Sequence, residues 1–298
     1  MNNIPPKICS YSCVYCQLGS ALHQELERKA FYPISEIVSQ VSDRVMKVHE
    51  KRENIDYLTF VPDGEPTLDV NLGREIEALK SLGPKIAVIT NSSLLWRKDV
   101  REELMNADWI SLKVDSVSET VWRRINRPYQ SLKLDMILEG VREFSRLFKG
   151  ELTTETMLVE GGNDGEEAIR SVAEFLTEIE PDLSYVAVPT RPPAEQWVRP
   201  PAENIVNAAY QIFKERLPNV ELLTGYEGNE FVSAANIEDD LLAITAVHPM
   251  RRDGVERLLS SANAGWEVVD KLIKENELKE VEYQGAKYFL RSHLQTRA

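Results

Sequence analysis

Short apolar runs alternate with longer amphipathic stretches from residue 56 to about residue 225. The apolar runs are near-continuous and rich in Val, Ile and Leu, which is typical of strands buried on both faces. Six of them predict strands, at 56–61, 85–90, 109–114, 152–159, 184–188 and 219–223. Stretches with helical spacing predict helices at 34–50, 72–82, 98–106, 133–148, 166–178 and 202–217.

This alternation of strand and helix predicts right-handed βαβ units and therefore a parallel sheet of the α/β class. Five or six such units give an open or nearly closed barrel. In parallel β/α barrels the chemistry takes place at the carboxyl ends of the strands. Polar residues that directly follow the predicted strands are therefore the first candidates for a site.

The pattern changes after about residue 237. Three helices are predicted, at 239–247, 254–261 and 266–276, and residues 279–291 alternate around a turn at Gln284-Gly285, a hairpin signal. Three helices followed by a hairpin is the order of a winged helix. Nine basic and eight acidic residues from Arg251 onward nearly balance, which favours docking of a partner or substrate over reading of DNA. We expect a core at 1–228 and a winged-helix-like α+β docking domain at 238–298.

The formal net charge of −13 over 298 residues argues against broad, nonspecific binding of nucleic acid. The net charge does not exclude a local basic patch, for which the candidates are Arg123, Arg124, Arg127 and Lys113. The alternative interpretation is a solvated helix face with scattered basic side chains. No apolar run reaches the roughly 18 residues of a membrane span, and the N-terminus lacks the apolar segment of a signal peptide. We expect a protein of the reducing cytoplasm that has no membrane partner.

All three cysteines of the chain fall within Cys9-Ser-Tyr-Ser-Cys13-Val-Tyr-Cys16. The spacing C-x3-C-x2-C is the pattern that holds three irons of a 4Fe–4S cube and leaves the fourth iron open. Ordinary buried cysteines are one alternative, because free Cys behaves as a small hydrophobe. Structural zinc is a second alternative, but it needs four ligands, and the nearest further candidate is His23. A disulfide framework is disfavoured by the odd number and by the expected compartment.

The cysteine segment and its surroundings closely resemble the cluster loop of radical S-adenosylmethionine (SAM) enzymes. The resemblance is greatest to the iron–sulfur oxidoreductase branch that is grouped with the wyosine tRNA-synthesis enzymes. It continues through Asp63-Gly-Glu-Pro-Thr-Leu68, Thr90-Asn-Ser-Ser-Leu-Leu-Trp96, Arg124-Ile-Asn-Arg-Pro128, Met157-Leu-Val-Glu-Gly-Gly-Asn-Asp164 and Arg191-Pro-Pro-Ala-Glu195 with Trp197. It spans residues 4–225 and implies an incomplete parallel (βα)6 radical-SAM barrel.

The resemblance implies that Cys9, Cys13 and Cys16 bind one 4Fe–4S cluster and that SAM chelates the fourth iron. Reduction of the cluster then cleaves SAM to a 5′-deoxyadenosyl radical that abstracts hydrogen from a substrate. It also implies an electron donor of the flavodoxin or ferredoxin type. The cofactor supplies the difficult chemistry, and the protein supplies position and a dry cavity.

The same resemblance assigns cofactor contacts to residues near the cysteines and at the strand ends. Gly64 permits close approach of the backbone, and Glu65 and nearby backbone carbonyls accept from the SAM ammonium group. Lys113 pairs with the SAM carboxylate, and Asp115 holds the ribose. Arg191 reaches an anionic substrate. The full expected set is Tyr15, Gly64, Glu65, Pro66, Thr90, Asn91, Lys113, Asp115, Glu155, Met157, Thr190 and Arg191.

Two departures from the family pattern bear on function. The barrels of the family begin with a strand before the cluster loop, and here only eight residues precede Cys9, so 1–7 is either a stub of that strand or what a trimmed start leaves. The chain also has no cysteine for the second cluster that wyosine synthesis requires. We therefore expect a single-cluster enzyme with a macromolecular substrate, tRNA or protein. The alternatives are an activase that places a glycyl radical on a partner protein, and an iron–sulfur winged-helix regulator.

Overall fold

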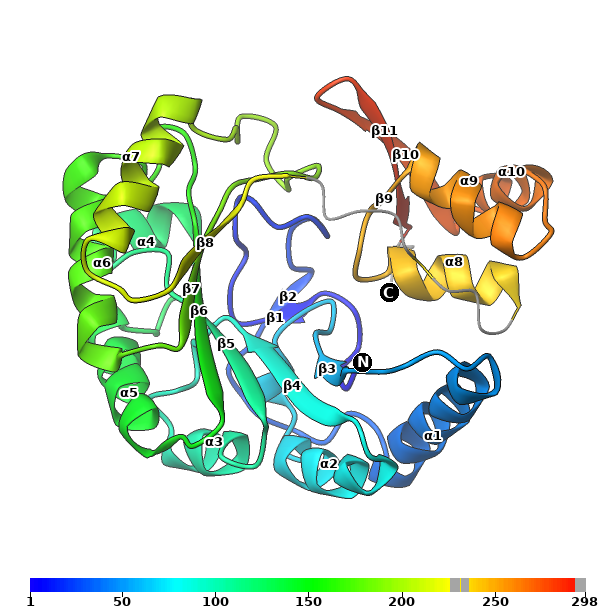
Figure 1. The fold of residues 1–298 in the computed structure, drawn as a ribbon, viewed down its shortest axis with the longest axis horizontal. Helices are drawn as coiled ribbons and strands as arrows, with labels where there is room; N and C mark the ends of the chain where they lie inside the picture. Colours follow the sequence, from blue (N-terminus) through cyan, green and yellow to red (C-terminus); the bar gives the residue numbers. More distant parts are fainter. Residues whose placement is uncertain (226–230, 232–235, 293–298) are drawn as a thin grey trace.

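Six parallel strands form the main sheet of the computed structural model, which describes residues 1–225, 231 and 236–292. The strands follow one another in sequence order across the sheet (Figure 1). They are β3 (Tyr57–Phe60), β4 (Lys85–Thr90), β5 (Trp109–Lys113), β6 (Glu151–Met157), β7 (Leu183–Ala187) and β8 (Val220–Leu223). All six predicted strands are present, and the sequential parallel order is that of an open β/α barrel.

Helices cover the outer side of this curved sheet (Figure 1). They are α1 (Ile34–Glu50), α2 (Leu72–Leu79), α3 (Lys98–Leu104), α4 (Glu119–Ile125), α5 (Leu134–Leu147), α6 (Glu166–Ile179) and α7 (Glu203–Lys214), with 3₁₀ turns η1 (Pro66–Leu68) and η2 (Lys80–Leu82). Helix α4 was not predicted, because its seven residues bury only Trp122 and Ile125 and give too short a periodic signal.

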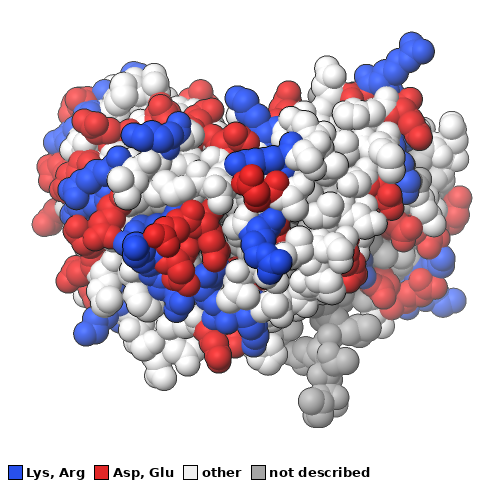
Figure 2. Space-filling model, turned by 90° about the horizontal axis from the view of Figure 1, so that it is seen from below, with Lys and Arg blue, Asp and Glu red and all other residues white. Residues whose placement is uncertain are grey.

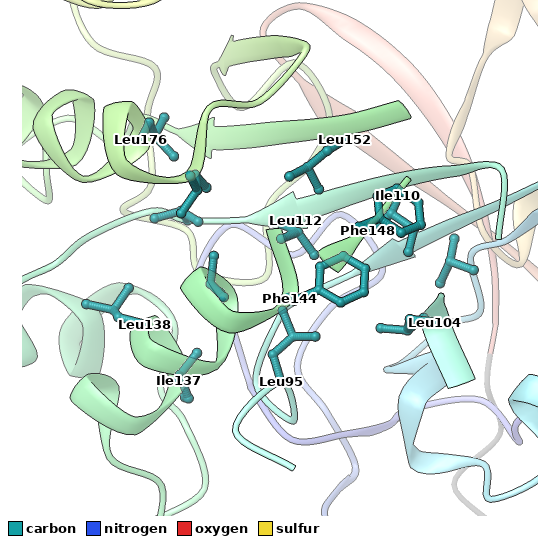
Figure 3. Packing of buried hydrophobic residues seen from close by; sticks show 14 of the residues in the cluster. Leu95, Leu104, Ile110, Leu112, Ile137, Leu138, Phe144, Phe148, Leu152 and Leu176 are labelled. Carbon is teal, nitrogen blue, oxygen red and sulfur yellow. The ribbon is translucent and has the colours of Figure 1, made fainter. Parts of the chain in front are cut away.

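The core lies between the sheet and the helices. Figure 3 shows Phe144 of α5 among Leu95, Leu104, Ile110 and Leu112, and all five side chains are nearly inaccessible to solvent. The contact is close because α5 carries Gly140 on this face. A Cβ at position 140 would lie 2.2 Å from the carbonyl oxygen of Leu95, so no larger residue fits there.

The N-terminal segment runs beside β3. The Met1 amine donates to the carbonyl of Thr59 at 2.5 Å, and the N–H of Lys7 donates to the carbonyl of Asp63 at 2.7 Å. The two-residue strands β1 (Ile8–Cys9) and β2 (His23–Gln24) then pair in parallel and bracket the cysteine segment. The main sheet itself begins at β3, so no strand before the cysteines belongs to it in the described residues.

The C-terminal elements are α8 (Ile237–Thr245), β9 (Met250–Arg251), α9 (Arg252–Ser261), α10 (Glu267–Lys274), β10 (Leu278–Tyr283) and β11 (Ala286–Arg291). Their strands form an antiparallel sheet in the order β10-β11-β9 around a separate apolar cluster. The hairpin turns at Gln284-Gly285, as predicted, and both residues have positive φ, 50° and 74°. Residues 226–228 and 293–298 of the two expected domains lie outside the described residues.

The C-terminal elements lie across the open side of the barrel, between β8 and α1 (Figure 1). Arg44 of α1 and Asp240 of α8 form an ion pair of 2.7 Å at this junction. Because Asp240 is almost completely buried, the pair links α8 firmly to α1.

Basic and acidic side chains are interspersed on the face shown in Figure 2. The four candidates do not gather into a free basic patch. Arg123 pairs with Glu119, Arg127 pairs with Glu195, and Lys113 lies inside the molecule beside Glu155, which leaves Arg124 as an exposed candidate. Among the described residues, no helix is both long and apolar enough to cross a membrane.

Candidate active site

A cavity of about 470 Å³ opens at the carboxyl ends of the strands, a volume within the range of small-molecule sites. All three cysteines line it. The expected contact residues that also line it are Tyr15, Gly64, Glu65, Thr90, Asn91, Lys113, Glu155, Met157, Thr190 and Arg191. Pro66 and Asp115 do not face it. Glu155 and Met157 share one face of β6, as strand alternation predicted.

The cysteine loop is held by backbone contacts on two sides. The N–H of Val14 donates to the carbonyl of Ile125 at 2.9 Å, and the N–H of Glu65 donates to the carbonyl of Ile8 at 3.1 Å. A Cβ on Gly64 would lie 2.0 Å from that Ile8 oxygen. The close approach that Gly64 permits is therefore to the cysteine loop of the same chain.

Burial makes the three thiols poor acids. It raises the pKa of Cys13 to about 12, with a further contribution from the charge of Asp115, and raises the pKa of Cys9 well above its ordinary value. It also raises the pKa of Cys16, against the nearby charge of Lys7. Three adjacent thiolates at this place need a cationic centre to stabilise them, which is the condition that a metal cluster meets.

The Glu65 side chain links η1 to the end of β4 and also lines the cavity. One carboxylate oxygen accepts from the Thr67 N–H (3.1 Å) and from the hydroxyls of Thr67 and Thr90 (2.6 Å each), and the other accepts from the Asn91 N–H (2.8 Å). Burial raises the pKa of Glu65, and these hydrogen bonds oppose the shift. Oε2 of Glu65 accepts this one hydrogen bond from Asn91 and the residue lines the cavity, so its expected role as acceptor of the SAM ammonium group stays a prediction.

Asp115 is an internal anchor. Its carboxylate accepts from the Tyr15 hydroxyl, from Nδ2 of Asn126 at 2.6 Å and from the N–H of Met157 at 2.8 Å. The expected ribose contact of Asp115 is not supported, because the residue is buried behind the cavity wall and holds Tyr15 in place. Asn126 was missed as a site residue, although it lies in the Arg-Ile-Asn-Arg-Pro motif.

Lys113 and Glu155 form an ion pair within the cavity. Burial disfavours the charged form of Lys113, but the carboxylates of Glu155 and Asp115 overcome this effect and raise its pKa above the ordinary value. The ammonium group also lies 5.1 Å from the centre of the Tyr15 ring. The cavity thus presents one fixed cation and one fixed anion side by side.

The C-terminal part of the chain completes the cavity wall with Val247 and His248. Nε2 of Gln17 donates to the carbonyl of Val247 at 3.2 Å, and Nη1 of Arg191 donates to Oε1 of Gln17 at 2.9 Å. Nη2 of Arg191 lies 3.3 Å from Nε2 of His248. Sequence reasoning did not name Gln17, Val247 and His248 as cavity residues. Gln17 directly follows Cys16, whereas no local pattern marks Val247 and His248.

The radical SAM superfamily model matches residues 3–175, which is more than half of the chain. The UPF0026 protein MJ1312 of Methanocaldococcus jannaschii is 45% identical over 294 residues, 98% of this chain and 91% of that protein.

Among the solved structures compared, SuiB shows the likeness of fold. Streptococcus suis SuiB bound to S-adenosylmethionine has a TM-score of 0.55 and 15% identity, over 75% of this chain and 49% of that one. Archaeal TYW1 has a TM-score of 0.48 and 16% identity, over 67% of this chain and 68% of that one. The chain therefore belongs to the radical SAM superfamily, which uses a 4Fe–4S cluster and S-adenosylmethionine.

Proposed function

We propose that this chain is a single-cluster radical SAM enzyme whose cluster is held by Cys9, Cys13 and Cys16. The observation that carries the proposal is that the three thiols line one cavity together with the carboxyl ends of the strands. Bound there, the cluster and SAM supply reductive cleavage of SAM and abstraction of hydrogen from a substrate. The side chains of the cavity position SAM and keep water from the reacting groups.

Lys113 and Glu155 are the side chains that we assign to SAM. SAM carries a carboxylate and an ammonium group on one carbon atom, and the cavity offers one cation and one anion as neighbours. Lys113 takes the carboxylate and Glu155 faces the positive groups, so that binding exchanges one ion pair for two. Met157, from the same face of β6, adds apolar surface.

The remaining expected contacts divide into two groups. We keep the expected roles of two residues: the backbone at Thr190 receives the adenine, and Arg191 receives an anionic group of the substrate. Glu65, Asn91 and Asp115 hold the cysteine loop and the strand ends in position through the hydrogen bonds described above.

The substrate that we propose is a macromolecule, tRNA or protein. The support for this is the C-terminal α+β unit at 238–298, a winged-helix-like docking module that follows a core at 1–228. It contributes Val247 and His248 to the cavity wall, so a partner docked on it reaches the site. A flavodoxin- or ferredoxin-type donor supplies electrons in the reducing cytoplasm.

The test is anaerobic reconstitution of the cluster, followed by addition of SAM and dithionite and measurement of 5′-deoxyadenosine. We expect product from the wild-type chain, and neither cluster nor product from Cys13→Ala. Ser12→Ala is the matched control, since it alters the same loop without removing a thiol. An intact cluster that yields no 5′-deoxyadenosine refutes the enzymatic proposal, and product from Cys13→Ala refutes the ligand assignment.

A further inference from the structure

Two asparagine side chains point their amide nitrogens at two of the three cysteine sulfurs. Nδ2 of Asn91 lies 3.4 Å from Sγ of Cys9, and Nδ2 of Asn126 lies 3.6 Å from Sγ of Cys13. The two residues come from different elements: Asn91 directly follows β4, and Asn126 caps the end of α4. The cysteine loop therefore receives a donor from each side.

The orientation of the Asn91 amide is fixed by its other contacts. Its Oδ1 accepts from the N–H of Ser93 at 2.9 Å, so the oxygen side of the amide is occupied by a donor. Its Nδ2 also lies 3.0 Å from the hydroxyl of Ser10. The nitrogen side, with its two hydrogens, is consequently directed at Ser10 and at the sulfur of Cys9.

The orientation of Asn126 is fixed by Asp115. Nδ2 of Asn126 lies 2.6 Å from a carboxylate oxygen of Asp115, which can only accept while it is ionised. The residue is almost completely buried, and its backbone N–H donates to the carbonyl of Trp122 at 2.8 Å. The amide cannot turn its oxygen toward Asp115 without repulsion, so its nitrogen stays on the side of the Cys13 sulfur. The Tyr15 hydroxyl lies 3.0 Å from the same nitrogen, so its two hydrogens are shared among three acceptors.

Hydrogen bonds to the sulfurs are one of the means by which a protein sets the potential of an iron–sulfur centre. Reduction adds negative charge that is shared with the thiolate ligands, and an N–H donor stabilises that charge. We propose, on the basis of the proposed function, that Asn91 and Asn126 raise the reduction potential of the cluster through Cys9 and Cys13. Asn91 is then a positioning residue for the thiolate, a different role from the expected contact with SAM.

The decisive measurement is the midpoint potential of the reconstituted cluster, followed by electron paramagnetic resonance without SAM. Asn91→Ser keeps a side-chain acceptor for the Ser93 N–H and removes the amide that reaches the sulfur. We expect a more negative midpoint in Asn91→Ser, and a still more negative one in Asn91→Asp, which also adds charge. Ser10→Ala is the matched control, because it removes the other acceptor of the same amide, and its midpoint stays unchanged.

A second measurement needs no variant. The wild-type chain is labelled with ¹⁵N in asparagine side chains, and hyperfine coupling of ¹⁵N to the reduced cluster is sought. Coupling to two nitrogens supports the proposal, and absence of coupling overturns it. An unchanged midpoint in Asn91→Ser with a fully assembled cluster also overturns it. Failure of the wild-type chain to assemble a cluster refutes instead the proposed function on which this inference rests.

Discussion

The hydroxyl of Tyr288 donates a hydrogen bond to the carbonyl oxygen of Thr190 at 3.0 Å, and the two residues are 98 positions apart in the sequence. Tyr283 makes the corresponding bond to Pro189 at 3.1 Å. The two tyrosines of the β10–β11 hairpin thereby hold the segment that follows β7. Because that segment lines the cavity, the hairpin supports the site from behind.

Removal of both hydroxyls, in Tyr283→Phe/Tyr288→Phe, is expected to loosen this segment. Each hydrogen bond contributes about 1 kcal/mol net, so loss of both is expected to raise the population of the locally open state roughly 30-fold. Hydrogen exchange at the amides of Thr190 and Arg191 reports the change. The control is Tyr185→Phe on β7, whose hydroxyl makes no hydrogen bond within the described part of the chain. Equal exchange in the double variant and the wild type would contradict the expectation.

Gly64→Ala is expected to displace the cysteine loop. The added Cβ would lie 2.0 Å from the Ile8 carbonyl oxygen, and the backbone at Gly64 has a φ of 155°. Overpacking of this kind costs about 1–3 kcal/mol or more, so the urea midpoint falls and cluster loading decreases. Gly165→Ala serves as the control, since open space surrounds that position. Normal loading and stability in Gly64→Ala would show that the loop can retreat without loss.

Glu75 gives the fold a dependence on pH. Burial, reinforced by the charge of Asp69, raises the pKa of Glu75 from 4.5 to about 8. Between about pH 4.5 and pH 8, the Glu75 carboxyl therefore stays protonated in the native state, whereas it is ionised in the unfolded chain. The contribution of the protonated carboxyl to stability is fully present below about pH 4.5 and is lost as the pH rises through about 8.

Glu75→Gln is accordingly expected to raise the melting temperature relative to the wild type more at pH 8.5 than at pH 5. Thermal unfolding followed by circular dichroism at the two pH values measures the difference. Glu77→Gln on the same helix is the control, because Glu77 is exposed and pairs with Lys80. An equal effect of Glu75→Gln at both pH values would show that Glu75 titrates normally.

The sequence was sufficient to predict the six strands of the main sheet. They are short apolar runs, such as 85–90, and such a composition is typical of strands that are buried on both faces. The sequence also marked the cavity, since Lys113 and Glu155 end or line adjacent strands. The sequence could not show which of the polar residues at the strand ends form hydrogen bonds with one another. How far the Glu65 carboxylate is available to a ligand depends on its hydrogen bond from Thr90, 25 residues later, and that bond exists only in the folded chain.

The far wall of the cavity was beyond sequence reasoning for a similar reason. His248 follows a helix of ordinary composition, and its proximity to Arg191 arises from the packing of the C-terminal unit against the barrel. No periodicity or motif links the two positions. Helix α4 was not predicted because it is short. The position of Asn126 at its end, with the amide nitrogen near Cys13, was therefore not predicted either.

The contact between Gln17 and Val247 joins residues 230 positions apart, and it has a consequence for biosynthesis. A chain emerges from the ribosome with its N-terminus first. The cysteine loop is therefore made before the wall that covers it. Until residues 247 and 248 have been made and folded, the three thiols face the medium without that cover. Insertion of a cluster before the C-terminal unit folds thus meets a more open site than insertion afterwards.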